Sequence, residues 1–408
     1  MYNLVGLVSI LVLILITLII GLRWPAVSRV LLIALVVRFL FLIINNHIFH
    51  LPDGNMDAKN FEQFAWDHSQ GDFINNFSNY LRPDAYFLSF MLAVPYYLFG
   101  RSILLVQSLS ILFGIGCVFL GWLVAKKLWD NSIAIKVAWS IALFPSIISY
   151  SVLTMREVYI SFFLLLAIYG IVNWIRLNNF KSIFVIFTGF IGATFFHGPL
   201  ILGLFIFLLI ITLDNLKKTF KLIMNGRINL KILTLIILSS FILGLYLTNK
   251  IDIPYIQTFD RSIDPIFLKN TVINLKVKGD AAYPEWTKID SNVEFFYKIP
   301  LRSLYFIFSP FPWDISKPSH VIGVLDSFLY MTLVYLIFLN RKVIWKDPAL
   351  RMILIILLSY IVIFGVGVGN FGSGIRHRSK FAIEFILLAA PLIPRFTFFK
   401  NNKFKKIS

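Results

Sequence analysis

The 408-residue sequence has little charge, few acidic residues and almost no cysteine. Charged residues make up 14% of the chain, and the single cysteine, Cys117, lies within an apolar run, which excludes a disulfide framework and a cysteine metal site. Only 20 residues are acidic against 38 basic ones, and a net charge of +18 could indicate a nucleic-acid partner. The basic residues, however, flank long apolar runs, as they do in membrane proteins, so we expect no nucleic-acid binding.

Apolar sequence is what the chain has in abundance. Hydrophobic residues make up 58% of it, and its mean hydropathy is +0.81. The apolar runs are continuous rather than alternating, which predicts an all-α polytopic membrane protein and not a transmembrane barrel. The first run is too long for the core of a signal peptide, so we expect a retained helix there. We predict eleven spans, at about 3–22, 30–45, 102–124, 134–151, 158–175, 182–196, 198–213, 232–248, 320–339, 352–368 and 382–396.

Charge decides the predicted orientation. Residues 85–99 are apolar but short and contain Pro95, so we expect a re-entrant or interfacial segment. The segments then predicted to be cytoplasmic hold 21 of the 38 basic residues but only three of the acidic ones. The positive-inside rule therefore places the N-terminus outside and the C-terminus inside. The chain 1–408 forms a single membrane domain in this interpretation, with extracytoplasmic loops at 46–101, 152–157, 249–319 and 369–381.

The first of these loops contains a predicted amphipathic helix that begins at Asp57 and lies on the membrane surface. Asp57 could simply cap the first turn, or its carboxylate could act as a general base or bind a divalent ion such as Mg²⁺ or Mn²⁺. Asp67, near the end of the same helix, is a second candidate base. A loose group of possible metal ligands precedes the helix: His47, His50 and Asp53.

Charged residues also occur next to and within the predicted spans. Arg156 and Glu157 form a turn between two spans, where they could be ordinary interface residues or could point into a cavity shared with the first loop. Arg38 lies in the middle of a span, so it must face the protein interior or a wet cavity and find a partner. Either Asp326 or Glu384 could supply that partner, in a structural pair or in a substrate site.

The strongest functional signal is the segment 369–380. It places Arg376, His377, Arg378 and Lys380 on the side of the membrane that the positive-inside rule keeps poor in basic residues. Glycines precede this basic group, and flexible backbone amides together with guanidinium and ammonium groups suit a phosphate or pyrophosphate. Anionic lipid headgroups could also bind here.

The segment 299–314 carries three prolines and cannot span the membrane. We expect it at the outer interface, with aromatic residues such as Trp313 at the depth of the headgroups. It could form a groove for a lipid tail or an ordinary aromatic belt. Arg302 within it, and His197 at a predicted hairpin tip, are further candidates for a lipid or substrate groove.

This arrangement resembles the GT-C superfamily of polytopic membrane glycosyltransferases, and most of all those of bacterial surface-polysaccharide gene clusters. The likeness covers roughly residues 30–395, and Ser309-Pro-Phe-Pro-Trp313 and Arg376-His377-Arg378 are similar to recurring motifs. The resemblance implies that Asp57 is the first-loop general base or metal ligand and that Arg376 and Arg378 lie near a lipid phosphate. The sequence departs from the pattern at Arg82-Pro83-Asp84, where the family usually has Pro-Pro, and in its Arg156-Glu157 turn.

We therefore expect a glycosyltransferase of the inner (plasma) membrane, with its active site on the extracytoplasmic side. Its partners would be membrane lipids, a polyprenyl-phosphate-linked sugar donor, and a glycan or lipid-linked acceptor. Asp57, helped by Glu157 or Asp67, would deprotonate the acceptor. The lipid phosphate would bind to Arg156, Arg376, His377, Arg378 and Lys380, and the substrate groove would include Arg38, Arg302, Trp313 and His197. A repeat-unit polymerase and a flippase or transporter of lipid-linked oligosaccharides are the alternatives.

Overall fold

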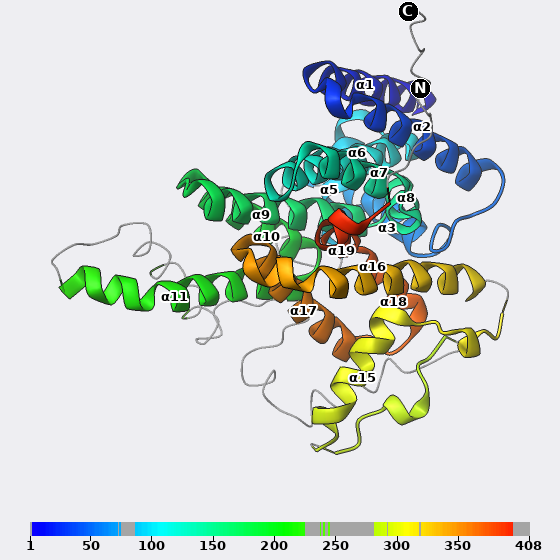
Figure 1. The fold of residues 1–408 in the computed structure, drawn as a ribbon. Helices are drawn as coiled ribbons and strands as arrows, with labels where there is room; N and C mark the ends of the chain where they lie inside the picture. Colours follow the sequence, from blue (N-terminus) through cyan, green and yellow to red (C-terminus); the bar gives the residue numbers. More distant parts are fainter. Residues whose placement is uncertain are drawn as a thin grey trace, which may run out of the picture.

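The computed structural model describes residues 2–71, 73–74, 86–224, 281–291, 293–317 and 320–394, with the single positions 237, 240 and 244. Within this part of the chain the regular structure consists of 15 α-helices and short 3₁₀ turns, which confirms the predicted all-α class. In Figure 1 α1 and α2 lie at the top and α15 lies at the bottom, and the C-terminal helices α16 to α19 lie between them.

Prolines and acidic caps set several of the helix boundaries. Pro25, Pro145 and Pro348 occupy the first turns of their helices, where a missing N–H costs nothing, and Asp130 and Asp347 cap two N-termini through their side chains. The first half of the chain forms α1 (Tyr2–Arg23), α2 (Pro25–His47), α3 (Asp57–Ser69), α5 (Phe87–Phe99), α6 (Ile103–Leu128), α7 (Asn131–Leu143), α8 (Pro145–Val152) and α9 (Glu157–Leu177). The second half forms α10 (Lys181–Phe196), η1 (Gly198–Leu200), α11 (Ile201–Met224), η3 (Glu285–Thr287), α15 (Glu294–Phe308), η4 (Pro312–Asp314), α16 (His320–Lys346), α17 (Pro348–Gly367), α18 (Phe371–Ser379), α19 (Ala382–Ala389) and η5 (Ala390–Leu392).

The protein is a multi-pass membrane protein, but the predicted count of eleven spans was wrong. Six helices in the described part of the chain are long and apolar enough to cross a membrane: α1, α2, α6, α9, α16 and α17. The pair α7–α8, bent by 56°, would make a seventh if it is one broken span. A crossing needs about 20 residues, whereas α10 has 16, α5 has 13, and the apolar helices at Gly198–Leu213 and Ala382–Leu392 are also short. The span predicted at 232–248 lies outside the described residues.

The segment predicted to span at 382–396 shows how an apolar run can be misread. All residues from Ala382 to Ala390 are buried inside the protein. Side chains of other helices reach its carbonyl groups: Trp129 Nε1 donates to Leu387 O at 3.1 Å, and Lys136 Nζ donates to Pro391 O at 2.9 Å. The segment is a core helix, so its hydrophobicity reflects packing against protein rather than contact with lipid.

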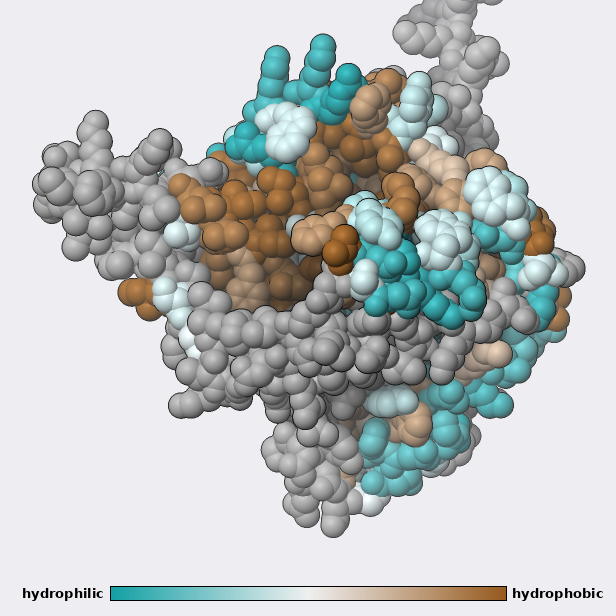
Figure 2. Space-filling model, turned by 90° about the horizontal axis from the view of Figure 1, so that it is seen from below, coloured by the Kyte–Doolittle hydropathy of each residue, from teal (hydrophilic) through white to brown (hydrophobic). Residues whose placement is uncertain are grey.

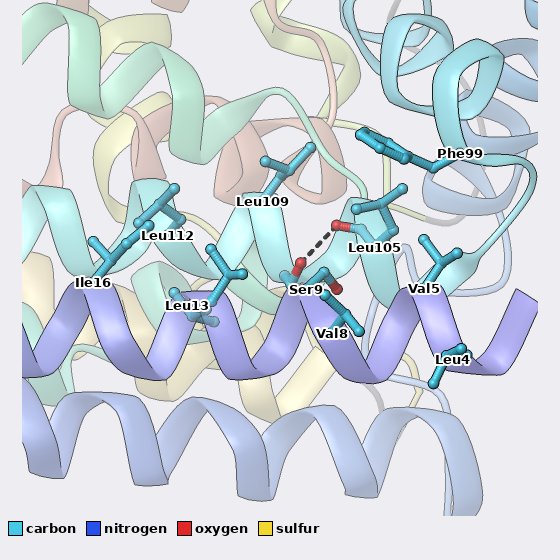
Figure 3. A pocket seen from close by; sticks show the side chains of 12 residues that line it. Leu4, Val5, Val8, Ser9, Leu13, Ile16, Phe99, Leu105, Leu109 and Leu112 are labelled. Carbon is cyan, nitrogen blue, oxygen red and sulfur yellow. Dashed lines mark hydrogen bonds between the residues drawn. The ribbon is translucent and has the colours of Figure 1, made fainter.

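The outside of the helical body is broadly hydrophobic. Seen from below, a large apolar area is bordered by hydrophilic residues (Figure 2). An apolar groove of about 420 Å³ lies between α1 and α6 and includes Phe99 at the end of α5 (Figure 3). Such surfaces are expected where a protein faces lipid chains.

One ion pair locates the end of the molecule predicted to be cytoplasmic. Arg176, in the last turn of α9, pairs with Asp347 in the turn between α16 and α17. Both residues belong to segments that the charge distribution assigns to the inside. Helix α9 begins at Glu157, so the charged residues around Glu157 lie at the end of this spanning helix opposite to Arg176.

Candidate functional site

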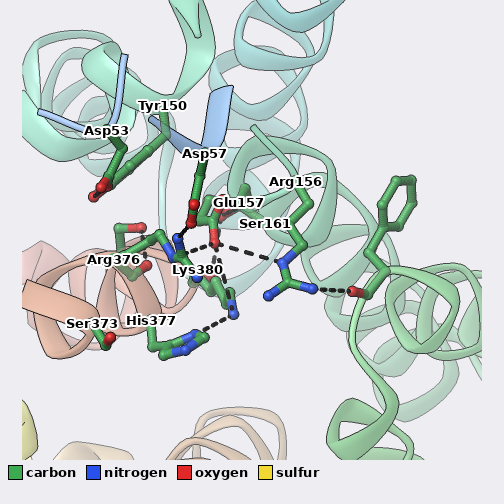
Figure 4. A network of polar contacts seen from close by, with 12 residues as sticks. Asp53, Asp57, Tyr150, Arg156, Glu157, Ser161, Ser373, Arg376, His377 and Lys380 are labelled. Atoms are coloured by element: carbon green, nitrogen blue, oxygen red, sulfur yellow. Dashed lines mark hydrogen bonds and ion pairs between the residues drawn. The ribbon is translucent and has the colours of Figure 1, made fainter. Parts of the chain in front are cut away.

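Three segments that are far apart in the sequence meet at one group of charged side chains (Figure 4). They are the turn leading into α3, the start of α9, and helix α18 with the residue that follows it, all within segments predicted to be extracytoplasmic. We call this group the charged cluster. It consists of Asp53, Asp57, Arg156, Glu157, Arg376, His377 and Lys380, with His197 and Tyr150 at its border.

Asp57 is a partly exposed carboxylate of the cluster. It is the first residue of α3, but Met56 occupies the N-cap position, so Asp57 is not the cap of this helix. Its carboxylate instead accepts a hydrogen bond from Arg376 Nη1 on α18, and its side chain is 44% exposed. The pair therefore places a solvent-accessible base directly beside a guanidinium.

Glu157 lies beneath this pair, surrounded by three cations. Its carboxylate is 3.5 Å from Arg376 Nε and 4.0 Å from both Arg156 Nε and Lys380 Nζ, while its side chain is only 1% exposed. Neither carboxylate oxygen accepts a hydrogen bond from the described residues. Burial disfavours the charge on Arg376, but Glu157, Asp57 and Asp53 outweigh it and raise the pKa of the guanidinium above its usual value. Glu157 thus lies close to three cations, but its carboxylate oxygens accept no hydrogen bond from them.

Lys380 and His377 extend the cluster towards His197. Lys380 Nζ lies 2.6 Å from His377 Nδ1, and the His377 ring contacts the His197 ring at a centroid distance of 5.4 Å. Burial lowers the pKa of Lys380, although Glu157 opposes this effect. Burial, together with Lys380 and Arg376, also lowers the pKa of His377 well below its usual value. His377 is therefore held neutral next to the cations.

Asp53 belongs to the cluster although sequence reasoning treated it only as part of a loose metal group. It adopts a positive φ of 66° in the turn before α3 and accepts a hydrogen bond from Tyr150 at 3.2 Å. Burial raises the pKa of this carboxyl, against the opposing effect of Arg376. The Pro-Asp-Gly sequence at 52–54 is a turn signal that could have drawn attention to it.

Helix α3 is held in place by a buried carboxylate, Glu62. It accepts hydrogen bonds from Tyr96 at 2.7 Å and from Arg101 Nε and Nη2 at 3.0 and 2.8 Å. A second contact joins Ser89 Oγ to the carbonyl of Phe61 at 2.8 Å. These bonds fasten α3 to α5 and to the loop that precedes α6, and so fix where Asp57 lies.

Arg378, which the sequence assigned to phosphate binding, points away from the charged cluster. Its guanidinium is buried and donates to Asp326 from Nε at 2.9 Å and from Nη2 at 2.6 Å. It also donates to the carbonyls of Ile307 and Ser309. Arg378 therefore ties α18 to α15 and α16.

The remaining sequence-derived candidates lie elsewhere. Asp67 is ten residues beyond Asp57, about 15 Å along α3, and accepts from Gln63 at 2.8 Å. Trp313 is 73% exposed, at the surface. Arg302 is buried and donates to the carbonyls of Thr287, Val366 and Val368.

Arg38 does not form the predicted carboxylate pair in the described part of the chain. It is fully buried, and its Nη1 donates to the carbonyls of Ala34 and Ala142 at 3.1 and 3.3 Å. Ala142 lies at the end of α7, where the bend before α8 interrupts the helix hydrogen bonds. Arg38 therefore helps to satisfy the backbone at this bend.

The donor set does not favour a divalent metal. Among the residues described by the structure, no three His, Cys, Asp or Glu side chains are grouped closely enough to hold an ion. His47 and His50 are exposed, and Asp57 faces a guanidinium. We therefore propose no step through Mg²⁺ or Mn²⁺.

The fold defines the class of this chain: a helical, multi-pass membrane protein with a charged cluster built from three distant segments. Comparison with models of protein families, with curated proteins and with solved structures found no match to it.

Proposed function

We propose that the protein is a membrane glycosyltransferase that works at the extracytoplasmic face of the inner (plasma) membrane. It would move a sugar from a polyprenyl-phosphate-type donor to a glycan or lipid acceptor during synthesis of a surface polysaccharide or glycoconjugate. The observation that carries the proposal is that Arg376 contacts both an accessible carboxylate, Asp57, and the buried Glu157, which also faces Lys380. A base next to a phosphate-binding group is what this transfer requires.

In the proposed reaction Asp57 accepts the proton of the acceptor hydroxyl as its oxygen bonds to the anomeric carbon of the sugar. The bond from that carbon to the phosphate oxygen breaks, and the leaving phosphate keeps the electron pair. Arg376 and Lys380 stabilise the charge that grows on it, with Arg156 nearby. Glu157 positions these three cations, and neutral His377 is a further hydrogen-bond donor or acceptor. We leave Arg378 and Asp67 out of this machinery, because their side chains are bonded elsewhere.

The proposed orientation, with the charged cluster outside the cytoplasm, is supported by the two ends of α9. The charged cluster surrounds its first residue, and Arg176 pairs with Asp347 near its last. The basic residues Lys126 and Lys127 end α6 on that same predicted cytoplasmic side. A cluster facing away from the cytoplasm needs a lipid-linked rather than a nucleotide-linked donor.

The test is the mass profile of polyprenyl-linked sugars in cells that lack the protein. We expect an intermediate short by one sugar, cleared by the wild-type protein but not by Asp57→Asn. Asp67→Asn, which makes the same chemical change on the same helix, should clear it. An unchanged profile in cells lacking the protein would refute the proposal. Complete repeat units accumulating outside would indicate a polymerase instead, and units trapped inside would indicate a flippase.

A further inference from the structure

Two tryptophans in the predicted extracytoplasmic loop 249–319 present exposed indole rings. Trp286 in η3 is 50% exposed, and Trp313 in η4 is 73% exposed. A row of ring contacts joins them: Trp286 packs edge-on against Tyr305 at 5.6 Å, and Tyr305 packs against Phe311 at 5.1 Å. Phe311 in turn stacks on Trp313 at 4.8 Å with an interplanar angle of 6°. We call these four residues the aromatic platform.

Charged side chains flank both exposed rings. Glu285, beside Trp286, is 89% exposed and pairs with Lys288 at 2.7 Å. Asp314 follows Trp313, and its carboxylate accepts from the backbone N–H of Phe311 at 2.9 Å. A carboxylate beside each ring would be costly within hydrocarbon. These carboxylates favour a position of the aromatic platform outside the hydrocarbon core, where its exposed rings are accessible to a ligand.

The aromatic platform is connected to α18, the helix that carries Arg376 and His377 of the charged cluster. Tyr283 packs on Tyr305 at 5.3 Å, and its backbone N–H donates to Gly369 O at 2.9 Å, just before α18. The neighbouring Ala282 forms a β-bridge with Asn370. Arg376 follows the start of α18 by five residues, about 8 Å along the helix axis. An extended ligand seated on the rings would thus lie close to the proposed site of transfer.

We propose that the aromatic platform binds sugar rings of the acceptor glycan. The apolar C–H face of a pyranose can pack on the flat face of an indole ring. The hydroxyl groups of the sugar can then form hydrogen bonds with Glu285, Lys288 and Asp314. The identification of these sugars as the acceptor rests on the proposed function, whereas the binding of sugar rings to the aromatic platform does not.

The experiment measures saturation-transfer NMR between the full-length protein in lipid nanodiscs and the disaccharides cellobiose, chitobiose and lactose. We expect transfer to the ring C–H protons with the wild-type protein, and binding about 3- to 10-fold weaker with Trp286→Ala or Trp313→Ala. Trp313→Tyr, which keeps an aromatic ring, should retain most of the binding. Trp345→Ala is the matched control, because Trp345 is 53% exposed near the opposite end of α16.

Three results would overturn the proposal: no transfer to any of the three disaccharides, equal transfer with and without the two indoles, or quenching of Trp313 fluorescence by brominated lipid chains. The last result would place the rings in the membrane as an aromatic belt. Asp57→Asn should bind the disaccharides like the wild type, since binding needs no turnover. The NMR experiment therefore tests sugar binding by the aromatic platform alone. The proposed transferase activity is tested separately by the profile of lipid-linked sugars.

Discussion

Replacing Glu157 by glutamine tests the charged cluster most directly. Glutamine keeps the size of the side chain but removes the charge that faces Arg156, Arg376 and Lys380 at 3.5–4.0 Å. One unit-charge contact at 4 Å is worth about 4 kcal/mol at an effective dielectric constant of 20. Burial of the ions and repulsion among the three cations offset much of the total. Removing one partner of a buried ion pair typically costs about 3–5 kcal/mol, and we expect Glu157→Gln to lower the free energy of unfolding by that amount.

The free energy of unfolding can be measured by denaturation with sodium dodecyl sulfate in mixed micelles. A double-mutant cycle can be built from Glu157→Gln, Lys380→Met and the double variant. We expect a coupling energy of about 1–3 kcal/mol, because the loss of the carboxylate destabilises the protein less when one of its cations is also removed. Glu285→Gln is the matched control: its side chain is 89% exposed, and the substitution should leave the free energy of unfolding unchanged. Wild-type stability of Glu157→Gln, or simple additivity in the cycle, would refute the three-cation arrangement.

Three further outcomes are expected. Arg376→Ala should lower kcat of sugar transfer about 10²- to 10³-fold, as loss of one oxyanion donor does. The control Arg351→Ala, near the opposite end of the molecule, should leave kcat unchanged. Near-normal turnover of a correctly inserted Arg376→Ala protein would contradict the proposed role of Arg376. Arg378→Met should lower the free energy of unfolding by about 3–5 kcal/mol, because it strands Asp326, while the folded fraction keeps its KM for the donor; a change in KM alone would argue for phosphate binding. The pKa of His377 is lowered in the folded protein, so its contribution to stability is present above its ordinary pKa of about 6.5 and is lost as the pH falls below it. Denaturation measured between about pH 7 and 5 should show this loss. The free energy of unfolding of His377→Asn should depend less steeply on pH.

Side-chain direction on a helix explains much of what sequence reasoning missed in the site. Arg376 and Arg378 were treated as equivalent because the segment was expected to be a flexible loop. It is instead helix α18, and residues two positions apart on a helix point in nearly opposite directions. Arg376 therefore meets Asp57, while Arg378 meets Asp326.

Local sequence was sufficient for other features. The amphipathic helix starting at Asp57, the short non-spanning run ending near Phe99 and the mid-span burial of Arg38 all follow from periodicity, length and charge, and the structure confirms them. The partner of Arg38 did not follow, because a bend between α7 and α8 supplies backbone carbonyls that no sequence pattern reveals.

The sequence by itself determined that the protein is helical, that it crosses a membrane several times, and that its basic residues are concentrated in a few segments. These properties depend on composition and on hydrophobicity along the chain, which are local. Only the tertiary structure decided how many apolar helices are long enough to cross, since the helix at 382–389 is apolar because protein surrounds it. It also decided that Arg376 meets both Asp57 and Glu157, because contacts between residues 319 and 219 positions apart arise from packing between helices and not from any nearby sequence.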